Sequence, residues 1–233
     1  MKPSTIIILG GILGFITLIR PVNLLVITLT PFIIEKKNLL WFKTLFSTQQ
    51  KPFLIGTLSF VFIVSIQLII YKISTGSFFV YSYQEEGFDF SSPYFTDILF
   101  SYKKGLFLYT PIYLTSLLGI FIFWNKSKYL FFSGLGFFII ITYVFSSWWM
   151  WYYGGSFSSR VYVEYIPFFM ILMSLSLSKI PKGVLRKSYI TFIFLLTIIC
   201  QIQTYQYRRL QIHWEEMDET KYWNTFLRID KLI

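Results

Sequence analysis

Long apolar runs separated by polar breaks dominate this chain, and they restrict it to membrane folds. A helix of about 20 apolar residues crosses the hydrocarbon core of a bilayer. Runs of this kind cover residues 54–71, 106–124, 129–147 and 188–207, with a shorter one at 165–178. Only 14% of the 233 residues are charged and the mean hydropathy is +0.60, which leaves too little polar surface for a water-soluble globule. The sequence therefore excludes a soluble enzyme and predicts an all-α, polytopic membrane helix bundle.

The first 34 residues hold two further apolar stretches, 5–19 and 22–34, split by Arg20 and Pro21. One continuous helix of about 30 residues would run about 45 Å, which exceeds the hydrocarbon thickness. We therefore expect two short helices that meet at Arg20–Pro21, which gives about seven transmembrane segments in all. A signal peptide is the alternative, but no small-residue cleavage site precedes Arg20.

The distribution of Lys and Arg predicts the orientation in the membrane. With the N-terminus inside, residues 1–4, 35–53, 125–128 and 179–187 face inward and carry 11 positive charges against the single acid Glu35. The outward segments carry the other ten positive and ten negative charges. Because inner loops are enriched in Lys and Arg, we expect the N-terminus inside and the C-terminus outside. The transmembrane domain is then 1–207, with external loops at 72–105 and 148–164, and the aromatic-rich tail 208–233 predicts an external amphipathic helix.

Several kinds of chemistry are missing from the sequence. It has no phosphate-cradling glycine loop and no Ser-His-Asp arrangement. A lone Cys200 and a lone His213 give neither an intrachain disulfide nor a plausible metal site, so we expect no metal and no cofactor. The excess positive charge of +10 is concentrated in the predicted inner segments. This distribution favours a membrane-lipid partner and not nucleic acid. Any acid–base chemistry must come from carboxylates.

The external loop 72–105 contains the first candidate residues. Glu85 and Glu86 stand among aromatic residues and could act on a hydroxyl nucleophile as catalytic acids or bases. Aromatic faces such as that of Tyr83 could hold a sugar or a lipid chain. Lys103 and Lys104 precede a membrane span and could capture a phosphate at its surface. The alternative is an interfacial loop with solvated acids and snorkelling lysines.

The loop 148–164 contains the second group. Its aromatic residues are followed by Gly154 and Gly155, which permit a tight turn with positive φ, and then by Ser156 and Arg160. A charged residue between a tight turn and a membrane helix is a candidate binding site, and a guanidinium fork matches phosphate oxygens. We therefore expect Arg160, with Ser156, to bind substrate. The alternatives are an aromatic interfacial belt and an Arg160 that only pairs with Glu164 at i+4.

These motifs together resemble a known family. The segments Phe-Val-Tyr-Ser-Tyr at 79–83, Phe-Ser-Tyr-Lys-Lys-Gly-Leu-Phe-Leu-Tyr-Thr-Pro at 100–111 and Trp-Tyr-Tyr-Gly-Gly-Ser-Phe-Ser-Ser-Arg at 151–160 carry the likeness. They are similar to the C-terminal half of bacterial polytopic glycosyltransferases of GT-C architecture, in the protein O-mannosyltransferase and aminoarabinose-transferase group.

The resemblance implies an activity and a location. Such enzymes sit in the bacterial inner membrane and move a sugar from a polyprenyl-phosphate carrier to an acceptor on the outer face. The family carries its catalytic acid in the first external loop of its N-terminal half, whereas the first external turn here, Arg20–Pro21, contains no acid. We therefore expect little transfer by this chain alone, and a separate N-terminal half is an expected partner.

Two other function classes stay open from the sequence. One is a non-catalytic membrane module that binds a polyprenyl lipid or assists a partner half. The other, less favoured, is a small transporter, because no charged residue lies in the middle of the four clear spans.

Overall fold

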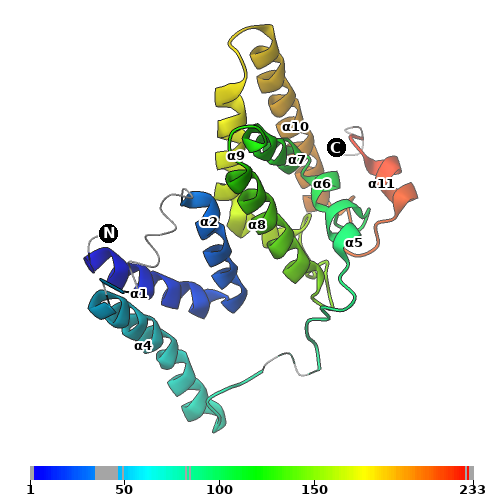
Figure 1. The fold of residues 1–233 in the computed structure, drawn as a ribbon. Helices are drawn as coiled ribbons and strands as arrows, with labels where there is room; N and C mark the ends of the chain where they lie inside the picture. The colour runs from blue at the N-terminus through cyan, green and yellow to red at the C-terminus, as the bar shows by residue number, and fades with distance from the viewer. Residues whose placement is uncertain are drawn as a thin grey trace. The chain divides into compact units, whose positions relative to one another are not determined.

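The computed structural model describes residues 3–34, 47–48, 50–81, 83, 85–228 and 230, and every regular element in this part is a helix. An isolated antiparallel bridge pairs Phe88 with Trp148. Four helical segments are long and apolar enough to cross a membrane: α4 (Gln50–Thr75), α8 (Lys128–Ser146), η4 with α9 (Arg160–Lys179) and α10 (Val184–Arg208). The predicted all-α fold with membrane-spanning helices is confirmed at this level (Figure 1).

The other three predicted segments form shorter apolar helices. They are α1 (Pro3–Ile19), η1 (Pro21–Leu29) with α2 (Thr30–Ile33), and α7 (Ile112–Leu118) with η3 (Gly119–Phe123). The predicted break at Arg20 is present, because Arg20 is extended at φ −162° and Pro21 starts the next helix. Seven spans and their orientation stay predictions. Residues Lys2, Glu35, Lys36, Lys37 and Lys43, which enter the charge comparison, lie outside the described residues.

The predicted span 106–124 is not one continuous helix. A short α5 (Phe95–Phe100) and α6 (Leu106–Tyr109) come first, and α7 begins only after Pro111. Proline disfavours helical geometry in the residue before it, and Thr110 accordingly leaves the helical region at φ −132° and ψ 64°. Because residues 106–124 are apolar almost throughout, hydropathy alone does not predict this interruption.

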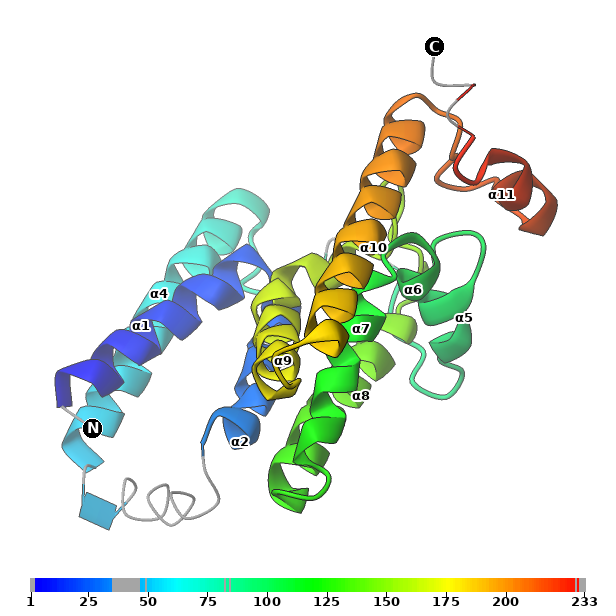
Figure 2. The ribbon, with the colours of Figure 1, turned by 90° about the horizontal axis from the view of Figure 1, so that it is seen from above.

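The chain divides into two compact units, Met1–Glu86 and Gly87–Ile233. In the first unit, α1 lies directly against α4, as Figures 1 and 2 both show. A Cβ atom on Gly10 would overlap the backbone of Gly56, and one on Gly56 would lie 2.8 Å from the carbonyl oxygen of Ile6. Small residues at this crossing therefore let the two backbones approach, as is common between membrane helices.

In the second unit, α7, α8 and α9 pack around an aromatic core. The ring centroids of Phe137 on α8 and Phe168 on α9 are 4.8 Å apart, and those of Tyr113 on α7 and Phe169 on α9 are 4.4 Å apart. At the C-terminal end of α8, the N–H groups of Asp89 and Tyr94 donate to carbonyl oxygens of the helix terminus. These bonds fix residues 87–95 at the same end of the unit as the loop that follows α8.

The tail folds back onto the second unit. A hydrophobic cluster buries Tyr109 with the tail residues Ile212, Met217 and Tyr222, and α11 (Glu219–Thr225) lies beside α5 and α6 (Figures 1 and 2). The hydroxyl of Tyr222 donates to the carbonyl oxygen of Leu108 at 3.2 Å. The tail contains this one short helix among its described residues, and an amphipathic placement on the membrane surface stays a prediction.

Candidate functional site

Lys104 is the centre of the candidate site. Its side chain is only 1% exposed, and its ammonium donates to the carbonyl oxygen of Tyr152 at 3.0 Å, to that of Gly154, and to the hydroxyl of Ser156 at 3.1 Å. An ammonium has three hydrogens to donate, so all three are engaged. The structure thus brings the predicted residues Lys104 and Ser156 together, and it wraps residues 152–156, the lysine loop, around one buried charge.

The backbone of this region is unusual. Gly154 has φ +64°, as the sequence predicted for a tight turn, but Tyr153 and Ser158 also take positive φ, at 53° each. Non-glycine residues in this region cost of order 1–3 kcal/mol each and persist only where surrounding contacts enforce them. The hydrogen bonds of the Lys104 ammonium to carbonyls on either side of Tyr153 supply such contacts.

Two serines fasten the end of the loop to the helices before it. The buried hydroxyl of Ser159 lies 3.0 Å from the carbonyl oxygen of Ile98 and 2.9 Å from that of Lys104. The hydroxyl oxygens of Ser158 and Thr110 are 3.2 Å apart. The segment is therefore a preorganised part of the fold rather than a loose connector.

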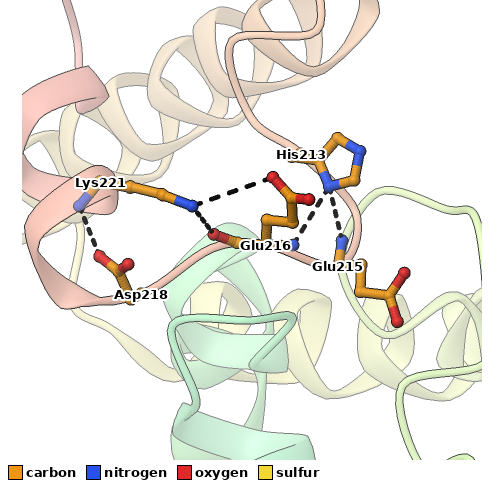
Figure 3. Close-up of polar contacts among 5 residues, drawn as sticks. All are labelled: His213, Glu215, Glu216, Asp218 and Lys221. Carbon is orange, nitrogen blue, oxygen red and sulfur yellow. Dashed lines mark hydrogen bonds and ion pairs between the residues drawn. The ribbon is translucent and has the colours of Figure 1, made fainter.

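The tail contributes a third segment to the site, which the sequence reasoning did not foresee. The ring of Trp214 lies 5.7 Å from the Lys104 ammonium and 6.5 Å from the ring of Tyr152. The Nδ1 atom of His213 accepts from the backbone N–H groups of Glu215 at 3.2 Å and Glu216 at 3.1 Å (Figure 3). Figure 3 also shows the Glu215 carboxylate pointing away from Lys221. The aromatic composition of the tail was the only signal for this packing.

Burial and neighbouring charge change the acidity of Lys104. The pKa of its ammonium is lowered to about 8, mainly by burial and to a lesser extent by the positive charges of Arg160 and Lys103, while Glu215 acts in the opposite direction. The Lys103 ammonium lies 3.5 Å from the centroid of the Tyr152 ring, within cation–π distance. Three cations are therefore gathered at one loop and make it electropositive.

Arg160 is exposed where the loop meets the apolar segment. It begins η4 (Arg160–Tyr165), which is a 3₁₀ helix, so residues three apart share a face. Glu164, four residues on, lies one position past that shared face. Arg160 is exposed at the start of this helix, four residues after the electropositive loop.

The remaining candidates belong to the other unit. Tyr83, Glu85 and Glu86 are exposed in Met1–Glu86. The backbone N–H of Glu86 donates to the Tyr83 carbonyl at 2.9 Å, and the Tyr81 hydroxyl donates to the Glu86 carbonyl at 2.5 Å. These bonds form a turn that leaves both side-chain carboxylates in solvent, and a catalytic role for them stays a prediction.

Among the described residues, no three His, Cys, Asp or Glu side chains gather as metal ligands would. Comparison with protein-family models, curated proteins and solved structures finds no match for the chain.

Proposed function

We propose that the chain binds the phosphate of a polyprenyl-phosphate-linked sugar at residues 103 and 156–160, as the C-terminal portion of a membrane glycosyltransferase. The transferase would pass the sugar to an acceptor on the outer face of the bacterial inner membrane. The observation that carries the phosphate-binding part is the buried Lys104, which holds the electropositive lysine loop four residues before the exposed Arg160. The resemblance of the motifs supports the transferase part.

The three cations at the site have different proposed roles in phosphate binding. The three donor hydrogens of Lys104 are engaged by the loop, so its contribution is shape and charge. Arg160 can form a bidentate contact with phosphate oxygens, which a lysine cannot reproduce. Lys103 is half-buried over Tyr152 and adds a second positive charge. The Ser156 hydroxyl already accepts a hydrogen bond from the Lys104 ammonium. Its main role is therefore to shape the loop, and binding of phosphate by this hydroxyl is secondary.

The position of Arg160 fits a lipid carrier. Arg160 opens the 20-residue apolar segment Arg160–Lys179, which spans about 30 Å as a helix and so matches the hydrocarbon core. Its guanidinium then lies at the level of lipid phosphates. In the proposed orientation, with the N-terminus inside, this is the outer face. The roles of Tyr83 as a sugar contact and of Glu85 and Glu86 as acid–base residues stay separate predictions from the sequence, because these residues belong to the other unit.

A non-catalytic membrane module is the second candidate, and the charge of Glu215 favours it. Glu215 acts to raise the pKa of the buried Lys104 ammonium and so stabilises its charged form. A module of this kind would bind a polyprenyl lipid or assist a partner half.

Binding and transfer can be measured on the same preparation. The purified chain in neutral nanodiscs is titrated with polyprenyl phosphate and, separately, with the polyprenyl alcohol. We expect saturable binding of the phosphate and at least tenfold weaker binding of the alcohol; equal binding would refute the phosphate site. Transfer from a labelled polyprenyl-phosphate sugar then separates the two candidates. We expect no turnover by this chain alone, and robust turnover would assign the chemistry to an acid it contains, such as Glu85 or Glu86.

A further inference from the structure

The end of the second unit remote from the lysine loop is purely cationic. Lys126 lies in the turn before α8 and Lys128 begins that helix, and four more cations lie between the end of α9 and the first turn of α10. These four are Lys179, Lys182, Arg186 and Lys187. Neither residues 125–128 nor residues 179–187 contain an acid. All six side chains are exposed except that of Arg186, which is half-buried.

Helix packing brings these two segments together. A Cβ atom on Gly119 in η3 would overlap the Leu172 carbonyl oxygen and the Ser176 hydroxyl oxygen of α9, so the two backbones are in close contact. Lys179 lies about one helical turn beyond Ser176 at the end of α9. The turn that follows η3 therefore lies beside the end of α9, so Lys126 and Lys179 carry their charges at the same place on the second unit.

This lysine pair is a like-charge contact with no compensation from its own segments. The nearby Lys179 side chain, and then its charge, lower the pKa of Lys126, as expected when one ammonium is placed near another. The first turns of α8 and α10 contain no acidic residue. The neighbouring Lys128 ammonium is directed over the Trp124 ring, 3.1 Å from its centroid. Two cations therefore face the same space, and an anion placed there would relieve their repulsion.

The pair is separate from the lysine loop. Helix α8 runs from Lys128 at the cationic end to Ser146 at the loop end, and its 19 residues span about 28 Å. The two ends of this helix therefore lie at the two edges of the hydrocarbon core, each at the depth of lipid headgroups.

We infer that Lys126 and Lys179 together bind the phosphate of an anionic membrane phospholipid at the end of α8 and α9. Three features favour a phospholipid over a soluble anion. The surrounding helices are apolar, with Phe121 and Trp124 exposed at this end, so acyl chains have a surface to contact. The lysine pair lies at headgroup depth. Basic clusters between membrane helices are known to recruit anionic headgroups. This site is independent of the proposed polyprenyl-phosphate site.

The test compares lipid binding by a contact-pair variant and a charge-matched control. The purified chain in neutral detergent is titrated with phosphatidylglycerol, phosphatidylcholine or inorganic phosphate, and bound lipid is counted by native mass spectrometry. We expect at least tenfold preference for phosphatidylglycerol. The double variant Lys126→Gln/Lys179→Gln should lose that preference, whereas Lys182→Gln/Lys187→Gln, which removes the same charge nearby, should change it less than threefold.

Other results would overturn the inference. An unchanged preference in the contact-pair variant would remove these lysines from the site, and equal losses in both variants would show a diffuse basic surface. Competition by millimolar inorganic phosphate would show a soluble-anion site. A second variant tests the geometry without lipid: Lys126→Glu replaces repulsion by attraction, so it should raise the midpoint of thermal unfolding in neutral detergent while abolishing phosphatidylglycerol binding. A lowered midpoint in a folded protein would show that the two side chains do not meet.

Discussion

The ammonium of Lys104 lies 3.1 Å from the hydroxyl oxygen of Ser156, a residue 52 positions further along the chain. With the bonds to the Tyr152 and Gly154 carbonyls, this contact joins the two segments that the sequence marked as separate external loops. A buried cation therefore organises the backbone from which Arg160 emerges.

Lys104 should make stability depend on pH in the alkaline range. Its pKa in the folded chain is about 8, below the ordinary value of 10.5 that applies when the chain unfolds. Between these values the unfolded state holds a proton that the folded state has lost, so stability rises with pH, by up to about 3 kcal/mol in total. Below pH 8 the full cost of burying the charge is present. The free energy of unfolding, measured from pH 7.5 to 10.5, should show this rise in the wild type and lose it in Lys104→Met.

Lys103→Met is the matched control for that experiment. Lys103 is half-buried and lies over the Tyr152 ring, and its removal should leave most of the alkaline rise in place, because burial and not the Lys103 charge is the main cause of the Lys104 shift. An identical pH profile for wild type and Lys104→Met would show that Lys104 is not the titrating group.

Substitution of Arg160 should weaken binding of polyprenyl phosphate without unfolding the chain. A charge-assisted hydrogen bond contributes about 1.5–3 kcal/mol, so Arg160→Ala should lower affinity roughly 10- to 150-fold. Arg160→Lys keeps the charge but loses the bidentate fork, and its loss should be smaller. Titration in nanodiscs gives both values.

The control, Arg208→Ala, removes an exposed cation at the end of α10 and should change affinity little. If Arg160 only pairs with Glu164, then Glu164→Gln would disturb folding as much as Arg160→Ala does. In that case affinity in folded Arg160→Ala would stay at the wild-type value.

Docking of the tail should depend on Tyr222. Its ring is 3% exposed, stands edge-on to that of Tyr109 at 5.4 Å, and its hydroxyl bonds to the Leu108 carbonyl. Tyr222→Ala should cost about 3–5 kcal/mol of docking free energy and make the tail sensitive to limited proteolysis. The neighbouring Trp223 is 54% exposed, so Trp223→Ala should leave proteolysis nearly unchanged. Equal protection of the tail in both variants would contradict the docking.

Adjacent glycines offer a sharp comparison in the first unit. A side chain at Gly10 would overlap Gly56, whereas a Cβ at Gly11 would lie 3.7 Å from Ile63 Cδ1 in ordinary contact. Gly10→Leu should therefore destabilise the packing of α1 on α4 by about 1–3 kcal/mol or more. Gly11→Leu adds the same volume and should cost markedly less. Equilibrium unfolding in mixed micelles measures both, and the reverse order would show that α1 and α4 cross elsewhere.

The proposed orientation can be tested by cysteine labelling in intact cells, after Cys200 is replaced by serine. An impermeant thiol reagent should label Ser91→Cys and should reach Lys182→Cys only after permeabilisation. Both positions are exposed, so neither result depends on burial. The opposite labelling pattern would reverse the topology.

Local signals made the long helices predictable, and non-local contacts explain what was missed. The runs at 54–71 and 188–207 became α4 and α10 because length and hydropathy alone suffice for a membrane helix. The break at Arg20–Pro21 could be predicted because a charged residue stands beside the proline. The similar break at Pro111 was missed because the residues around it belong to an apolar run.

The site was less predictable than the fold. Lys104 was expected at the surface, because the sequence cannot show that backbone carbonyls 48 and 50 residues away would satisfy a buried ammonium. The approach of Trp214 also depends on a distant segment, and no local pattern encodes it.

The docked tail has a consequence for the order of assembly during synthesis. Its bonds to Tyr102 and Leu108 join residues 117 and 114 positions apart, and the ribosome makes the receiving surface well before the tail. Contacts of such high sequence separation form late, since the intervening chain must be in place before they can close. Protection of Tyr222 from a protease should therefore appear after α8, α9 and α10 have packed. Protease protection of the tail would then report that the whole second unit has folded.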